Sequence, residues 1–168
     1  MIIYKPTMRF IILFILNNLV QVCLGQDNLL IDNKNGFGPF KLGHKFSQHK
    51  KNLILDTSIS LGQKYYIYAG RELIFDDFKA DKINIGFDHD VLFYLDIYFN
   101  DAGNYESIKS FFESEYGESI PAANSNQRGV VQLVGWQGEK VVAQLVQFNL
   151  EAGEEDRNKI VFMIFKKE

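Results

Sequence analysis

The clearest pattern in the chain is an alternation of apolar and polar residues on both sides of a short polar break. Apolar side chains alternate with other residues in 83–87 and again in 91–99, and Asp88-His89-Asp90 separates the two runs. A period of two is typical of a β-strand with one buried face, and two such runs around a polar break predict a β-hairpin.

Other segments rich in β-branched and aromatic residues predict further strands. They cover residues 65–68, 72–75, 130–136, 140–149 and 159–166. Gln137-Gly138-Glu139 provides a turn between two of them, and the polar residues 151–158 form a longer loop before the last. Consecutive strands with short connections predict an antiparallel meander.

Two segments predict helices. In the first, Ser47 is placed to cap a short helix over 48–55. In the second, Asn104 precedes Tyr105–Tyr116, in which apolar residues recur three and four positions apart, and Gly117 follows as a stop signal.

The order of these elements predicts an α+β fold: one antiparallel sheet of hairpins with two helices packed on one face. We expect residues 39–168 to form a single domain, preceded by a polar linker over 26–38. The two halves are loosely alike, because each has a helix ahead of a hairpin.

Residues 1–25 have the pattern of a cleavable secretory signal. Lys5 and Arg9 precede an apolar run over 10–16, and small residues, Cys23 and Gly25, stand at −3 and −1 if cleavage falls before Gln26. The run is too short to span a bilayer, so we expect an exported product, periplasmic or secreted, that is not membrane-spanning after cleavage. The signal resembles those of exported bacterial proteins.

Two alternatives remain open at this end. Met8 is a plausible true start, because Met8-Arg9 leads directly into the apolar run. Cys23 is a less favoured site of lipid anchoring, since bulky Val22 precedes it where a lipoprotein signal usually has a small residue.

Composition narrows the function classes. Cys23 is the one cysteine of the chain, so the mature protein would contain no disulfide, thiol nucleophile or thiolate metal site. The formal net charge is −3 at pH 7, and removal of Lys5 and Arg9 makes the mature chain more acidic. Nucleic-acid binding needs clustered Lys and Arg, and we expect no such partner.

Two short motifs are Phe40-Lys41-Leu42-Gly43 before a helix, and Tyr116-Gly117 with Pro121 between helix and sheet. Together they resemble the small exported BamE-like modules of the cell envelope. The resemblance implies a non-enzymatic α+β envelope protein that binds other proteins. The chain departs from that pattern in its signal and in its larger number of strands.

Asp88-His89-Asp90 offers three metal-capable side chains in a row, but neighbouring strand residues point to opposite faces and Asp favours turns. His44 and His49 are five positions apart, which is not the spacing of a helical zinc pair. We expect neither a metal site nor a cofactor.

No sequence motif of a zinc protease, a serine hydrolase or a phosphate-binding loop is present. A carboxylate pair assembled in space stays open, with Asp76, Asp77 and Asp96 as nominal candidates. The acidic residues of the last loop indicate a solvated turn: Glu151, Glu154, Glu155 and Asp156.

The strand 91–99 has apolar residues on both of its expected faces. The alternation places Leu92, Tyr94, Asp96 and Tyr98 on one face, where a half-solvated strand should carry mostly polar residues. That face is either covered or a contact surface for a partner. The candidate partner-binding residues are Leu92, Tyr94, Tyr98, Tyr66, Tyr68 and Trp136.

The leading hypothesis is an exported, non-enzymatic binding module that presents an aromatic sheet face to a protein or peptide, without an assigned oligomeric state. One alternative is a small exported hydrolase that uses Asp88, His89 and Asp90. Another is an inhibitor or immunity-type protein, which a small, acidic, exported chain also suits.

Overall fold

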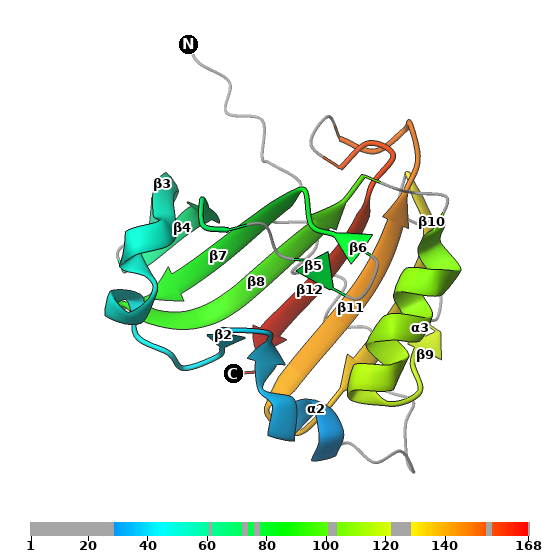
Figure 1. The fold of residues 1–168 in the computed structure, drawn as a ribbon, viewed down its shortest axis with the longest axis horizontal. Coiled ribbons are helices and arrows are strands. Elements are labelled where there is room, and N and C mark those ends of the chain that lie inside the picture. The colour runs from blue at the N-terminus through cyan, green and yellow to red at the C-terminus, as the bar shows by residue number, and fades with distance from the viewer. Residues whose placement is uncertain are drawn as a thin grey trace.

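An antiparallel sheet of eight strands organises the chain (Figure 1). The structure, a computed structural model, describes residues 29–60, 62–71, 74–75, 78–100, 104–121, 129–153 and 156–167. Across the sheet the strands lie in the order β3 (Leu53–Ser60), β4 (Gln63–Tyr68), β7 (Lys82–Asp88), β8 (Val91–Phe99), β12 (Ile160–Lys166), β11 (Val141–Phe148), β10 (Val130–Gln137) and β9 (Ile120–Pro121).

The helices are α2 (Leu29–Lys34) and α3 (Tyr105–Tyr116), and they contact each other and the sheet. Both lie on the same side of the sheet in Figure 1. The expected α+β fold, an antiparallel sheet with two helices, is therefore confirmed. The predicted signal over 1–25 lies outside the described residues, as do Asp76 and Asp77.

Shorter elements lie outside the eight-stranded sheet. They are the two-stranded pairs β1 (Gly36–Phe37) with β2 (Phe40–Lys41) and β5 (Ile74–Phe75) with β6 (Phe78–Lys79), and the 3₁₀ turns η2 (Phe46–Gln48) and η3 (Lys50–Asn52).

The sheet joins two four-stranded halves in antiparallel order. In the first half β3, β4, β7 and β8 follow one another across the sheet, and in the second β9 to β12 do the same. The two halves meet where the last strand of the first half, β8, pairs with the last strand of the second half, β12. Leu95 of β8 lies opposite Ile164 of β12. The predicted hairpin is β7 and β8, joined at His89 and Asp90.

The main core lies between the helices and one face of the sheet, which we call the first face. Residues paired directly across strands point to the same side, and one such row runs through Tyr66, Ile85, Leu95, Ile164, Ala143 and Trp136. All six are buried, together with Phe112 and Tyr116 of α3. Apolar burial against α3 is thus the main stabilising contact of this layer.

The predicted helix over 105–116 is confirmed with both of its ends. Its buried face consists of Tyr105, Ile108, Phe112 and Tyr116, the residues whose spacing indicated a helix. Gly117 ends it with φ +88°, a conformation that favours glycine, and its N–H donates to the carbonyl of Glu113 at 2.9 Å. The Asn104 side chain makes no capping hydrogen bond.

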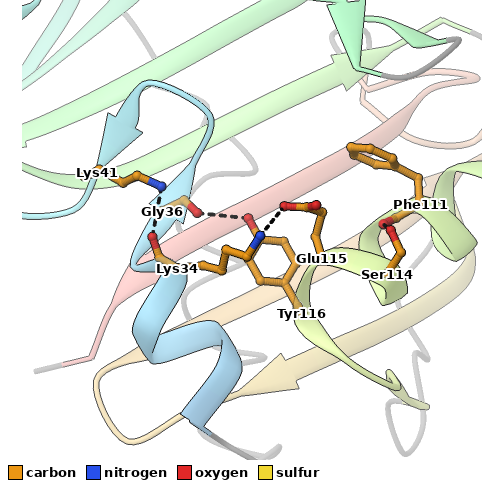
Figure 2. A network of polar contacts seen from close by, with 7 residues as sticks. All are labelled: Lys34, Gly36, Lys41, Phe111, Ser114, Glu115 and Tyr116. Carbon is orange, nitrogen blue, oxygen red and sulfur yellow. Dashed lines mark hydrogen bonds and ion pairs between the residues drawn. The ribbon is translucent and has the colours of Figure 1, made fainter.

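The segment 26–38, which we expected to be a linker, instead contains α2 and β1 within its described part. Ile31 and Phe37 are 2% and 4% exposed and belong to the main core. Polar contacts attach the segment to α3 (Figure 2): the Tyr116 hydroxyl donates to the Gly36 carbonyl at 2.9 Å, and the Lys34 ammonium lies 2.9 Å from a Glu115 carboxylate oxygen. The scattered apolar residues of this polar segment therefore pack into the main core and attach the segment to it.

Asp32 fastens α2 to the turn between β10 and β11. Its carboxylate accepts three backbone N–H groups, from Glu139 at 2.7 Å and from Lys140 and Val141 at 3.0 Å. A Cβ atom at Gly138 would collide with this carboxylate, so a larger residue there would displace Asp32 from the turn. One carboxylate thus satisfies three successive donors of a tight turn.

We expect Asp32→Ala to lower the free energy of unfolding by about 2 kcal/mol, because hydrogen bonds to a charged acceptor contribute more than neutral ones. Asp81→Ala is the control, since Asp81 is exposed and such surface changes usually stay within about 0.5 kcal/mol. Urea denaturation of both variants measures the difference. Equal losses would show that the Asp32 bonds do not stabilise the fold.

The helix expected over 48–55 is not formed. Instead η2 and η3 are followed directly by β3, whose Leu53, Ile54 and Leu55 pair with Tyr68, Ile67 and Tyr66 of β4. Three consecutive apolar residues suit a strand better than a helical face, and the ladder to β4 stabilises the extended form. The capping signal at Ser47 lies instead in a short 3₁₀ turn.

Candidate functional site

The opposite side of the sheet, which we call the second face, carries a group of aromatic side chains. One in-register row across this face contains Tyr65 of β4, Gly86 of β7, Tyr94 of β8 and Phe165 of β12. The helices α2 and α3 pack on the first face, and the smaller core cluster of the second face consists of strand residues and Ala152. Among the described residues, no helix covers this aromatic row.

A β-bulge adds Phe93 to the same group. Gly86 lies opposite Tyr94 and Phe87 lies opposite Leu92, so β8 contains one extra residue, Phe93, at this point. The extra residue reverses the alternation along the strand. As a result Leu92 is buried with the main core, whereas Phe93 lies beside Tyr94 on the second face.

Tyr65, Phe93 and Tyr94 form what we call the aromatic cluster. Ring centroids of Tyr65 lie 6.0 Å from those of both Phe93 and Tyr94, with interplanar angles of 73° and 77°. Edge-to-face pairs of this kind are favourable beyond the area that they bury. All three side chains are partly exposed, so the cluster reaches the molecular surface.

The backbone of Gly86 lies directly beneath the rings of the aromatic cluster. A Cβ atom there would lie 3.0–3.1 Å from the side chains of Tyr65, Phe93 and Tyr94. Because that is closer than ordinary van der Waals contact, the rings pack directly on the glycine backbone.

Three polar side chains and one methionine form the next row of the second face. Asn84, Asp96, Met163 and Gln144 face one another across four neighbouring strands, and all four are buried. The Asn84 amide nitrogen lies 3.5 Å from the Tyr98 hydroxyl, at the outer limit of a hydrogen bond. Neither the Asn84 Oδ1 nor the Gln144 Nε2 has a hydrogen-bond partner among the described residues.

Tyr94 links the aromatic cluster to this polar row. Its hydroxyl hydrogen-bonds with Asp96, two residues further along the same strand. Burial, followed by the neighbouring charge of Asp96, raises the pKa of Tyr94 well above its ordinary value. The hydroxyl is therefore held neutral, as a hydrogen-bonding group rather than a base, at physiological pH.

The six residues that the sequence suggested as a partner surface do not share one face. Tyr94 and Tyr98 lie on the second face, as expected from the alternation. Leu92, Tyr66, Tyr68 and Trp136 lie in or against the main core. Trp136 is tied there, because its indole N–H donates to the Gly117 carbonyl at 2.7 Å. A single six-residue patch is thus ruled out by the register, and a binding role stays a prediction.

Sequence reasoning missed Tyr65 and Phe93. For Tyr65 a signal existed, because strand alternation in 65–68 sets Tyr65 opposite to Tyr66. The position of Phe93 depends on the bulge, and simple alternation assigned it to the covered side.

Asp88, His89 and Asp90 form the tight end of the β7–β8 hairpin. His89 and Asp90 have φ of +46° and +64°, and Nδ1 of His89 lies 3.0 Å from an Asp88 carboxylate oxygen in an exposed pair. Of the acidic loop, Ala152 and Asp156 are buried, and Glu154 and Glu155 lie outside the described residues. No group of three or more metal-capable side chains occurs in the described part of the chain.

Comparisons with known proteins do not extend this picture. No protein-family model matches the chain, and neither a curated protein nor a solved structure matches it. Among the described residues, no helix is long and apolar enough to cross a membrane.

Proposed function

We propose that this protein is an exported, non-enzymatic binding module, and that a protein or peptide partner docks on the second face at Tyr65, Phe93 and Tyr94. The observation that carries the proposal is a cluster of three partly exposed aromatic rings on a sheet face that no described helix covers. Aromatic side chains that are large and rigid are enriched in the energetic centres of interfaces.

A local feature of the strand supports this place on the sheet. The bulge at Phe93 turns an additional ring toward the second face, and bulges are frequent beside functional sites. A contact surface at this position would therefore contain three aromatic rings from two strands.

The hydrolase alternative has less support from the geometry. Asp88 and His89 interact at an exposed hairpin end, where the pair is open to solvent. The resemblance to BamE-like envelope modules also suits a binding role.

The decisive variant is Tyr65→Ser with Phe93→Ser. We expect the mature chain beginning at Gln26 to capture a partner from envelope extract. The double variant should bind the purified partner at least about thirtyfold more weakly, since the loss of even one interface hot spot costs about 2 kcal/mol or more. Isothermal titration calorimetry with the purified partner measures the change, and circular dichroism checks that the variant is folded.

Leu55→Ser is the matched control. Leu55 is 55% exposed and pairs with Tyr66, a residue of the first face, so it lies on the opposite side of the sheet. Partner affinity should be unchanged in this variant. An equal loss in the control and the double variant, or no loss in either, would contradict the proposed site.

A further inference from the structure

Two half-buried histidines meet across a short segment of the chain, residues 43–49, which we call the strap. The strap leads from β2 toward η3 and contains η2. Nδ1 of His44 and Nε2 of His49 share a hydrogen bond of 3.3 Å, and the two rings are nearly parallel at 22°. One ring therefore donates and the other accepts, and the contact closes the strap on itself.

Backbone hydrogen bonds attach the strap to the β7–β8 hairpin. The Gly43 N–H donates to the Leu92 carbonyl, and the Leu92 N–H donates to the His44 carbonyl, both at 2.8 Å. The Phe46 N–H donates to the Asp90 carbonyl at 2.8 Å. Because these bonds all join the strap to residues 90–92, the strap can open as one local unit while the rest of the sheet stays paired.

The Phe46 side chain makes the main apolar contact between the strap and the sheet. The centroid of its ring lies 4.9 Å from that of Tyr66 and 5.4 Å from that of Phe87, both of which are buried. Phe46 itself is partly buried against the main core. Detachment of the strap would therefore uncover aromatic rings of β4 and β7 on the first face.

We infer that the histidine pair is an acid-sensitive switch, in which protonation of both rings releases the strap from the hairpin. A neutral or singly protonated pair can form the hydrogen bond, because one of the two facing nitrogens still has a lone pair. Once both rings are protonated, Nδ1 of His44 and Nε2 of His49 each hold a hydrogen. Two donors with like charge then face each other at 3.3 Å, and they repel.

The ionisable residues around the pair carry more positive than negative charge. On the strap, β2, η3 and the hairpin end they are Lys41, Lys45, Lys50, Lys51, Asp88, His89 and Asp90, and β4 adds Lys64 and the phenols Tyr66 and Tyr68. Asp88 contacts His89, and in the described part of the chain no carboxylate forms an ion pair with His44 or His49. The surroundings therefore do not compensate a second positive charge on the pair.

The pH range of the switch follows from His49. Burial, followed by the charge of His44, lowers the pKa of His49 below its ordinary value. A histidine in a released, solvated segment titrates near about 6.5, so the released strap binds protons more tightly than the attached strap. The attached form is therefore favoured above about pH 6.5 and loses that advantage as the pH falls below this value.

The test is hydrogen–deuterium exchange of the mature chain, detected by NMR at about pH 7.5 and about pH 5.0, on either side of the ordinary histidine pKa. After correction for the intrinsic exchange rate, the protection of the Gly43 and Phe46 amides should fall at least about tenfold at the lower pH, since one pKa unit corresponds to a factor of ten. Amides of β11 and β12 should keep their protection, because the opening is local.

His44→Gln and His49→Gln each remove one ionisable ring, and circular dichroism checks that each variant is folded. Either folded variant should lose the pH response of the strap. His89→Gln is the matched control and should keep that response, since His89 is exposed at the hairpin end and is not part of the pair. The switch is overturned by equal strap protection at both pH values in wild type, by a parallel loss in β11 and β12, by a full response in a folded pair variant, or by loss of the response in His89→Gln.

Discussion

Replacing Phe162 with alanine should lower the free energy of unfolding by about 3–5 kcal/mol, among the largest effects available in this chain. Phe162 is fully buried at the centre of β12, and its ring stacks on Phe112 of α3 with centroids 3.8 Å apart and planes 6° apart. Tyr116 stacks on the same ring at 5.6 Å. Truncation would leave a cavity between sheet and helix that these rings cannot fill by small movements.

Chemical denaturation with urea measures the loss, and Phe162→Leu provides the comparison. Leucine retains most of the buried apolar volume, so this variant should lose clearly less stability than alanine. Similar losses in the two variants would indicate that the shape of the aromatic stack, rather than its volume, stabilises the layer. A loss below about 1 kcal/mol for alanine would contradict the described core.

The strongest sequence signals concerned local periodicity, and these were reliable. In the β7–β8 hairpin, residues that face the core recur every two positions, and a turn ends β7. In α3 they recur every three to four positions, and Gly117 ends the helix. Such patterns depend on which residues of one element face the core. They require no knowledge of the neighbouring element.

Features that depend on pairing between distant segments could not be predicted. The bulge that moves Phe93 to the second face is visible only once β7 is in register with β8. Burial of Ile31 and Phe37 depends on docking against α3 and on Asp32 reaching a turn more than one hundred residues away. A polar segment with a few apolar residues looks like a linker when its partner is unknown.

The candidate site shows the same division. Alternation correctly placed Tyr94 and Tyr98 on one face, because both are separated from Asp96 by two positions on a regular part of β8. It grouped them with Tyr66 and Trp136, whose strands belong to different parts of the sheet and turn these side chains inward. The face of a residue relative to another strand is set by register, which a single sequence does not specify.

Tyr98 should behave as a core residue and Phe93 as a surface residue, although both are aromatic and lie on the second face. Tyr98 is 5% exposed and packs with Val161 and Met163, and the ammonium groups of Lys82 and Lys159 lie 5.6 and 5.5 Å from the centre of its ring. Tyr98→Ala removes this packing and the cation–π contacts together. We expect it to lower the free energy of unfolding by about 3–5 kcal/mol.

Phe93→Ala is the matched comparison on the same strand, and it should lower stability by no more than about 1 kcal/mol because the ring is partly exposed. Urea denaturation of the two variants, followed by binding of the partner where both remain folded, separates structural from contact roles. A stable Tyr98→Ala protein that lost its partner would extend the contact surface to Tyr98. A strongly destabilised Phe93→Ala protein would instead place the aromatic cluster in the core and remove the main support for docking on this face.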